Sequence, residues 1–314
     1  MKITYTLGII VVYAFVVSCS SMKTLEVNTQ TLSDEQLLRV SYNSEIAGEE
    51  RDYFLYLPKG YEEDSEKEWP VLMFLHGNGE RGNGKDELDF SMVHGPLMEA
   101  WVQKRDLPFI IINPQLHMFG LDTMGIDYLT YRDPNNIPRR LDVGVPDRDT
   151  DFPTDGGMNA EVPVSEFSEE LPLSEFGWDR VQNDLIGMID YVTENYQVDS
   201  KRIYLSGLSY GGFGTWYMAS HYANRFAAVI PVVGWGHPSL MPSIADAQLP
   251  VWAFAGGRDY VIEKKYFYKG LNQLEELGHT NVIFTVHEDM GHDAWKRVYA
   301  GEDVYNWLLG HSID

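Results

Sequence analysis

Short apolar runs recur along the chain from residue 37 onward, and turn residues or helical patterns separate them. Residues 70–75 (PVLMFL) and 109–113 (FIIIN) are almost wholly apolar, which is typical of strands buried on both faces of a parallel sheet. The pattern predicts strands at residues 37–44, 51–57, 70–75, 109–113, 201–205, 227–233, 251–255 and 282–287. Turn residues link the first two, which predicts an antiparallel pair.

Helical periodicity occupies three intervals of the same region. Residues 181–196 place their apolar positions near one face of a helix, and residues 266–277 and 294–309 do likewise. Strands that alternate with helices predict an α/β fold, with a mostly parallel sheet of about eight strands and helices on both faces. We expect residues 37–314 to form one domain.

Residues 117–177 interrupt this alternation after the fourth strand, with many prolines, glycines and acidic residues. A segment this long inside a compact domain is usually functional or disordered. It follows the carboxyl end of a strand, where α/β sheets bind ligands, so we expect an insertion or cap over the active site.

Three acidic residues of the insertion, Asp147, Asp149 and Asp151, alternate as in a calcium loop. Phe152 replaces the glycine that such a loop requires, and Met158 replaces its final glutamate. The pattern fits a solvated acidic loop better than a calcium site.

The composition is ordinary for a globular protein, with 44% hydrophobic and 23% charged residues. It excludes a disordered chain, a collagen and a multi-span membrane protein. Asp and Glu number 47 against 24 Lys and Arg, and the net charge of −23 disfavours a nucleic-acid partner. No feature of the sequence specifies an oligomeric state.

The first residues combine Lys2 with a mostly apolar run over residues 3–17. This run is shorter than the roughly 20 apolar residues of a transmembrane helix, so residues 1–18 are predicted to be a signal peptide. The polar residues 19–36 are expected to form a tether.

Cys19 is the single cysteine, so the chain has no internal disulfide. The sequence Val16-Val17-Ser18-Cys19 resembles the bacterial lipoprotein box, which implies a lipidated Cys19, and Ser20 in the next position resembles the signal for outer-membrane delivery. We expect a lipid anchor in the outer membrane, on its periplasmic or surface side. An ordinary signal peptide with an incidental Cys19 is the alternative.

The sequence Gly207-Leu208-Ser209-Tyr210-Gly211-Gly212 lies between a predicted strand and a helical pattern. This is the strand–turn–helix context of a nucleophile elbow, in which the serine is the nucleophile. The backbone N–H of Tyr210, at the helix N-terminus, is then placed to bind an oxyanion.

An acid and a base follow the next strands in the chain. Asp259 comes after the strand VWAFA, where a carboxylate can orient an imidazole, and His292 comes after the strand VIFTVH, as a general base. Asp246 precedes its strand and so falls at the wrong end, whereas Asp293 is the nearest substitute acid. The order serine, acid, histidine is that of the α/β-hydrolases.

A glycine-rich turn, LHGNGERG, follows the strand PVLMFL. We assign the second oxyanion donor to the backbone N–H of Asn78, and the backbone N–H of Gly79 is the next candidate. A phosphate-binding loop is excluded because Gly84-Lys85-Asp86 lacks the required hydroxyl. Trp235, in a loop after a strand, is interpreted either as a residue of the substrate pocket or as a buried loop tryptophan.

The chain resembles the α/β-hydrolase superfamily in the motifs LHGNGERG, Asn113-Pro114-Gln115, GLSYGG, GGRD and GHDAW. More narrowly, it is similar to secreted esterases and predicted peptidases near the phospholipase/carboxylesterase, polyhydroxybutyrate-depolymerase and feruloyl-esterase families. The resemblance covers residues 37–314 apart from the insertion. In such relatives a tryptophan soon follows the proline-glutamine pair, whereas here Trp178 comes only after the insertion.

These features predict a serine carboxylic-ester hydrolase that works through an acyl-enzyme and needs no metal or cofactor. The insertion is polar, and its spaced aromatics suit sugar stacking better than a lipid groove; they are Phe119, Tyr128, Tyr131, Phe152 and Phe167. We therefore expect a carbohydrate esterase of acetyl or feruloyl type, acting on a small-molecule or polysaccharide ester. The alternatives are a serine peptidase of the same fold and a non-catalytic glycan-binding lipoprotein.

Overall fold

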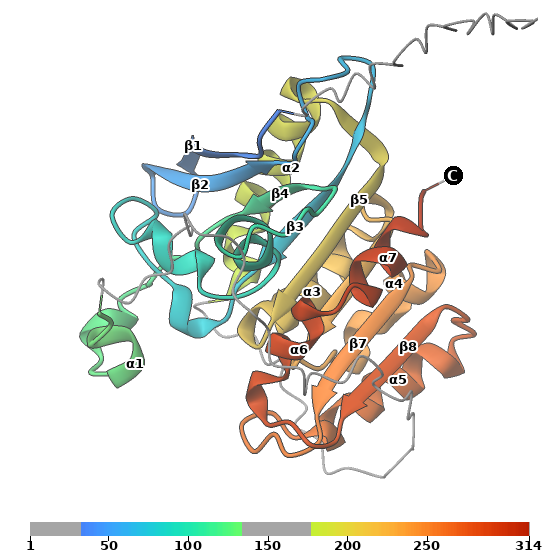
Figure 1. Ribbon diagram of the computed structural model, residues 1–314. Helices are drawn as coiled ribbons and strands as arrows, with labels where there is room; N and C mark the ends of the chain where they lie inside the picture. Colours follow the sequence, from blue (N-terminus) through green and yellow to red (C-terminus); the bar gives the residue numbers. More distant parts are fainter. Residues whose placement is uncertain (1–32, 134–176, 314) are drawn as a thin grey trace, which may run out of the picture. The chain divides into compact units, whose positions relative to one another are not determined.

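The computed structural model describes residues 33–133 and 177–313. Their eight strands form one sheet in the order β1-β2-β4-β3-β5-β6-β7-β8 (Figure 1). β2 is antiparallel to both neighbours, and all other neighbouring strands are parallel. The strands are β1 (Gln36–Ser44), β2 (Glu49–Leu57), β3 (Trp69–Leu75), β4 (Ile110–Asn113), β5 (Val198–Leu208), β6 (Ala228–Val232), β7 (Val251–Gly256) and β8 (Val282–His287). The predicted fold class and all eight predicted strands are confirmed.

β3 shows why the sheet needs cover on both faces. All seven of its residues are buried, and successive side chains point to opposite faces of a strand. Val71 and Met73 belong to one hydrophobic core, and Leu72 and Phe74 belong to the other. The continuous apolar run in the sequence therefore reflects two cores, one on each side of the sheet.

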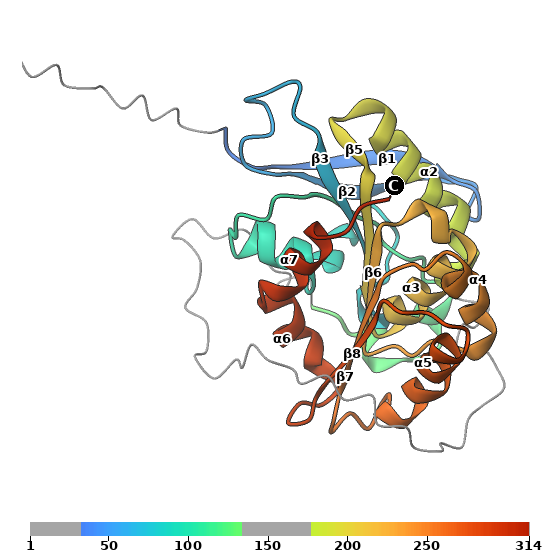
Figure 2. The same cartoon turned by 90° about the vertical axis from the view of Figure 1, so that its right-hand side faces the viewer.

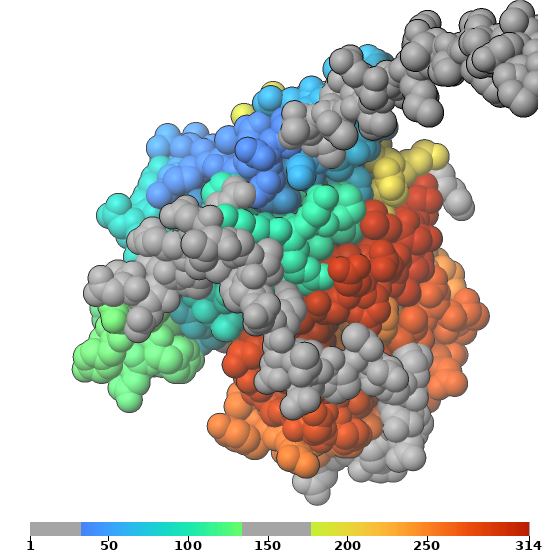
Figure 3. Space-filling model, viewed as in Figure 1, coloured from blue at the N-terminus to red at the C-terminus, as the bar shows by residue number. Residues whose placement is uncertain are grey.

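All helices except the short one at Asp127–Thr130 divide between the two faces of the sheet, as Figure 2 shows. The helices are α1 (Asp127–Thr130), α2 (Gln182–Asn195), α3 (Tyr210–His221), α4 (Met241–Asp246), α5 (Phe267–Glu276), α6 (Trp295–Ala300) and α7 (Asp303–Leu309). α2 to α5 supply the first core, and α6 and α7 supply the second. On that second side the C-terminal segment lies against residues near position 100 (Figure 3), where Arg105 donates to the carbonyls of Tyr299 and Ala300, both at 3.0 Å.

The single helix predicted over residues 294–309 is wrong. α6 ends at Ala300, and Gly301 is extended, with φ −69° and ψ 153°. α7 then begins at Asp303. A Cβ at Gly301 would lie 2.2 Å from Oδ1 of Asp303, so a larger residue at this corner between the two short helices would require the Asp303 side chain to move.

Several predictions fall on residues outside the described ranges. These are the signal peptide, Cys19, most of the tether, the acidic residues Asp147, Asp149 and Asp151, and the aromatic residues Phe152 and Phe167. Of the predicted insertion, residues 117–133 and Gly177 are described, and the former include α1. Within residues 33–133 and 177–313, no helix is long and apolar enough to cross a bilayer.

Candidate active site

The turn between β5 and α3 brings Ser209 to the edge of the sheet in a strained conformation, with φ 51° and ψ −115°. Such backbone strain is found mainly at functional sites. A Cβ at Gly211 would lie 1.9 Å from the carbonyl oxygen of Leu75, and one at Gly207 would lie 2.3 Å from the carbonyl oxygen of Gly211. The glycines of the motif are therefore required because the turn packs directly on β3 and on itself.

Hydrogen bonds fix this serine in place. Its backbone N–H donates to the carbonyl of Val232 at 2.9 Å, and its carbonyl accepts from the N–H groups of Gly212 and Phe213. Tyr210 begins α3, where backbone N–H groups point out of the helix and the dipole favours negative charge. The elbow thus presents both a hydroxyl and an anion-binding helix end.

The structure brings Ser209, His292 and Asp259 together. Oγ of Ser209 lies 2.9 Å from Nε2 of His292, and Nδ1 of His292 lies 2.7 Å from Oδ2 of Asp259. Oδ1 of Asp259 accepts hydrogen bonds from the backbone N–H groups of Val261 and Ile262 at 2.8 and 2.9 Å. The carboxylate orients the imidazole so that Nδ1 donates to it and Nε2 accepts from the serine hydroxyl.

The two other candidate acids lie elsewhere. Asp293 accepts a hydrogen bond from Lys296 at 2.9 Å, and its side chain is half exposed. Asp246 ends α4, before β7, at the opposite end of that strand from Asp259. Asp259 is therefore the acid that contacts His292.

The turn after β3 faces the serine from the other side. Asn78–Glu80 forms one turn of 3₁₀ helix, and a Cβ at Gly77 would lie 3.6 Å from Cβ of Ser209. The side-chain amide of Asn78 donates to the hydroxyl of Tyr128 at 2.7 Å and accepts from Arg81. The predicted second oxyanion donor therefore lies beside the elbow.

His76 holds that turn in place through hydrogen bonds of both ring nitrogens. Its Nε2 accepts from the backbone N–H of Leu116 at 2.9 Å, so Nδ1 carries the proton that reaches the carbonyl of Gly77 at 2.6 Å. Burial lowers the pKa of His76 to about 3, so the ring is neutral. Trp178 packs against this ring, with centroids 4.9 Å apart, and donates to the His76 carbonyl. Trp178, which follows the proline-glutamine pair only after the insertion, thus contacts the turn that carries Asn78.

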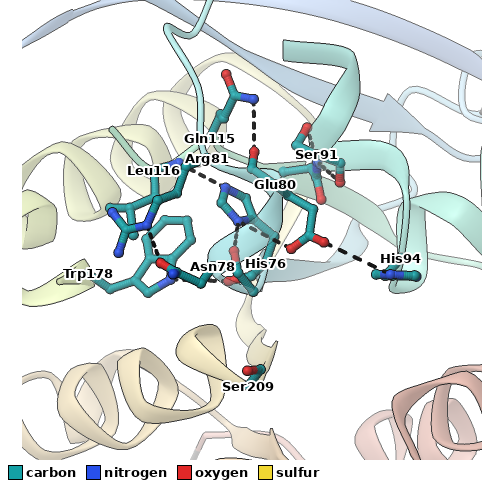
Figure 4. Close-up of polar contacts among 12 residues, drawn as sticks. His76, Asn78, Glu80, Arg81, Ser91, His94, Gln115, Leu116, Trp178 and Ser209 are labelled. Atoms are coloured by element: carbon teal, nitrogen blue, oxygen red, sulfur yellow. Dashed lines mark hydrogen bonds and ion pairs between the residues drawn. The ribbon is translucent and has the colours of Figure 1, made fainter. Parts of the chain in front are cut away.

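Glu80 is an unexpected buried acid in the wall of the site. Its carboxyl lies between the rings of His76 and His94, at 3.8 and 3.9 Å (Figure 4). Burial raises the pKa of Glu80 to about 7, and burial also lowers the pKa of His94 to about 4. Near neutral pH the acid therefore has two uncharged histidines as neighbours and is itself partly protonated.

These groups surround a cavity of about 450 Å³. It is lined by Gly77, Asn78, Gly79, Glu80, Tyr128, Leu208, Ser209, Tyr210, Phe213, Val261, Ile262, His292 and Trp295. Trp235 is not among these lining residues; it is buried and packs edge-on against Phe213, with ring centroids 5.7 Å apart. Among the described residues, the burial of Trp235 favours the interpretation as a buried loop tryptophan over the pocket interpretation.

Sequence reasoning missed most of the apolar lining. Val261 and Ile262 follow Asp259 closely, and Trp295 follows His292, so proximity to a predicted catalytic residue was the available signal. Tyr128 is one of the insertion aromatics that the sequence analysis names, but its contact with Asn78, 50 residues away in the chain, was not predicted. Within the described ranges, no group of three or more His, Cys, Asp or Glu residues could hold a metal ion.

Sequence comparisons match parts of this chain to known proteins. The pattern of the prolyl oligopeptidase family matches residues 178–287. A bifunctional acetylxylan esterase/xylanase from Neocallimastix patriciarum is 37% identical over 76 residues. That stretch covers 24% of this chain and only 11% of the relative.

Solved structures match over most of the chain. A thermostable esterase has a TM-score of 0.56 at 21% identity, with 88% of this chain and 63% of that chain covered. A putative dienelactone hydrolase from Klebsiella pneumoniae has a TM-score of 0.53 at 16% identity, with 88% and 97% covered. With the strand order and the strand–turn–helix at Ser209, these matches show that the chain has the α/β-hydrolase fold.

Proposed function

We propose that this protein is a serine carboxylic-ester hydrolase that removes acetyl or feruloyl groups from carbohydrates. The observation that carries the proposal is the hydrogen-bonded chain from Ser209 through His292 to Asp259 at the wall of the cavity. Its distances of 2.9 and 2.7 Å suit proton transfer from the serine hydroxyl to the imidazole.

Acylation begins when His292 takes the proton of Ser209 and Oγ attacks the ester carbonyl. The carbonyl oxygen becomes negative and is bound by the backbone N–H groups of Asn78 and Tyr210. His292 then protonates the leaving alcohol as the C–O bond breaks. Asp259 stabilises the imidazolium formed between these two steps.

Deacylation repeats the sequence with water. His292 takes a proton from water, and the resulting hydroxide attacks the acyl carbonyl. The tetrahedral intermediate collapses, Ser209 recovers its proton from His292, and the carboxylic acid leaves. The chain's own residues account for every proton in the cycle.

The cavity lining supports an ester with a polar alcohol and an acyl group placed beside the serine. Leu208, Phe213 and Ile262 offer apolar contacts near the serine, whereas Asn78 and Tyr128 offer polar groups. Tyr128 is 56% exposed, so its ring is accessible for stacking on a sugar. The partial match to an acetylxylan esterase/xylanase favours the same substrate class.

A substrate panel tests this proposal. Purified protein should hydrolyse p-nitrophenyl acetate, acetylated xylo-oligosaccharides or methyl ferulate, and Ser209→Ala should abolish each activity. A serine peptidase, the alternative to which the name of the prolyl oligopeptidase match points, would instead prefer peptide anilides. Failure of a fluorophosphonate to label Ser209 would indicate a non-catalytic binding protein.

We also propose that Cys19 carries a lipid anchor, with residues 1–18 removed and the outer membrane as destination. The lipoprotein-like box around Cys19 supports this location. The full chain expressed in a Gram-negative host should incorporate a labelled fatty acid and partition with membranes, whereas Cys19→Ser should not incorporate the label and should stay unprocessed or become soluble. An unlabelled wild-type protein would contradict the anchor without affecting the proposed activity.

A further inference from the structure

Arg81 follows the oxyanion turn and is 1% exposed, which is unusual for an arginine. Its Nε donates to the side-chain oxygen of Asn78, and Nη1 donates to the carbonyl of His117 at 2.8 Å. Figure 4 shows this guanidinium directed at Asn78, beside Trp178. The arginine therefore anchors the residue to which the second oxyanion donor is assigned.

The same guanidinium also contacts the elbow. Its central carbon lies 4.8 Å from the centroid of the Tyr210 ring, the geometry of a cation–π interaction. Asn78 follows β3 and Tyr210 follows β5, so their segments are far apart in the sequence. One buried side chain bridges the two residues whose backbone N–H groups would bind the oxyanion.

The charge of Arg81 is not neutralised by an acid in the described part of the chain. It forms no ion pair there, unlike Arg105 and Arg132, and the neighbouring Glu80 turns its carboxyl toward His76 and His94. Burial lowers the pKa of Arg81 to about 10, so it stays positive at neutral pH. A buried charge without a counterion is costly, but it strongly stabilises negative charge that develops nearby.

We propose that Arg81 is a positioning residue of the oxyanion hole: it fixes the spacing of Asn78 and Tyr210, and its charge stabilises the tetrahedral intermediate. This inference rests on the proposed serine hydrolase function. Oxyanion donors must lie within a few tenths of an ångström of their ideal positions, and a misplacement of about 1 Å can cost about 100-fold in rate. The effect should appear in kcat, because ground-state substrate does not yet carry the charge.

The test compares Arg81→Met and Arg81→Lys with the wild type on p-nitrophenyl acetate. We expect Arg81→Met to lower kcat about 10- to 100-fold with KM within about threefold. The affinity of phenylboronic acid, which forms a tetrahedral adduct with the serine, should fall by a similar factor. Arg81→Lys keeps a positive charge but loses the planar fork, so its kcat should be lowered about fivefold or more.

Arg105→Met is the matched control. Arg105 also donates to backbone carbonyls and lies 5.5 Å from the centroid of a tyrosine ring, that of Tyr305, but it does not contact Asn78 or Tyr210. We expect this variant to retain wild-type kcat and boronate affinity, whatever its effect on the melting temperature. Equal losses of kcat in Arg81→Met and Arg105→Met would overturn the inference.

The outcomes separate this inference from the function on which it rests. A wild-type protein without Ser209-dependent turnover would refute the proposed hydrolase. An active wild type with kcat and boronate affinity unchanged in Arg81→Met would refute the role of Arg81 alone, as would a loss confined to KM. If the methionine variant does not fold, Arg81→Lys decides, and an unchanged kcat in that variant overturns the inference.

Discussion

Replacing Asp259 by asparagine is the sharpest test of the catalytic geometry. Oδ1 of Asp259 accepts from two backbone N–H groups, those of Val261 and Ile262. In Asp259→Asn the amide oxygen must keep these hydrogen bonds. A flipped amide would place its NH₂ group against two backbone N–H donors and leave them without an acceptor. At about 1–3 kcal/mol for each unsatisfied group, that flip costs about 2–6 kcal/mol.

The NH₂ group of the asparagine must therefore face His292, 2.7 Å from Nδ1 in the present geometry. Nδ1 then accepts, the ring proton moves to Nε2, and Nε2 can no longer take the proton of Ser209. We expect kcat to fall about 10³- to 10⁴-fold, or about 4–5.5 kcal/mol in activation free energy. The fold should persist, because volume and backbone contacts are conserved.

The assay is steady-state hydrolysis of p-nitrophenyl acetate, with the rate of fluorophosphonate labelling as a second measure of serine reactivity. Asp293→Asn is the control, since Asp293 lies one residue beyond His292 but pairs with Lys296. That control should retain wild-type turnover. A kcat for Asp259→Asn within about tenfold of the wild type would refute the argument from the fixed amide.

Three further predictions follow from the same geometry. Ser209→Ala and His292→Ala should each lower kcat on the order of 10⁵-fold, as stopped assays with folded protein would measure, and persistent fluorophosphonate labelling of Ser209→Ala would place the nucleophile elsewhere. Gly211→Ala should lower the free energy of unfolding by about 3 kcal/mol or prevent folding, because its Cβ meets the Leu75 carbonyl, and denaturant titration checks this. Burial raises the pKa of Glu80 from 4.5 to about 7, so the folded state keeps a proton that the unfolded state releases, and stability falls as pH rises through that window. Glu80→Gln should not show this fall. The unfolding free energy of Glu80→Gln minus that of the wild type should therefore rise by up to about 3 kcal/mol between pH 4.5 and pH 8. Parallel curves of unfolding free energy against pH for the two proteins would contradict this prediction.

Local sequence patterns were enough to predict the sheet and the order of the serine, acid and histidine candidates along the chain. Apolar runs such as PVLMFL predict buried strands, because a strand with a core on each face buries the side chains on both of its faces. Ser209, Asp259 and His292 each follow such a run, and the carboxyl ends of parallel strands share one edge of the sheet. The local patterns therefore sufficed to bring three distant residues to one place.

The surroundings of these three residues depend instead on contacts between segments that are distant in the sequence. Arg81 bridges Asn78 and Tyr210, and Tyr128 returns to Asn78, through contacts between segments that no local period relates. The helix break likewise lies at the extended residue Gly301, which helical periodicity does not register. Periodicity reports which face of an element is buried, whereas the partner across that face is set by how the elements pack. Buried charge, cavity lining and the oxyanion geometry belong to this second kind of information.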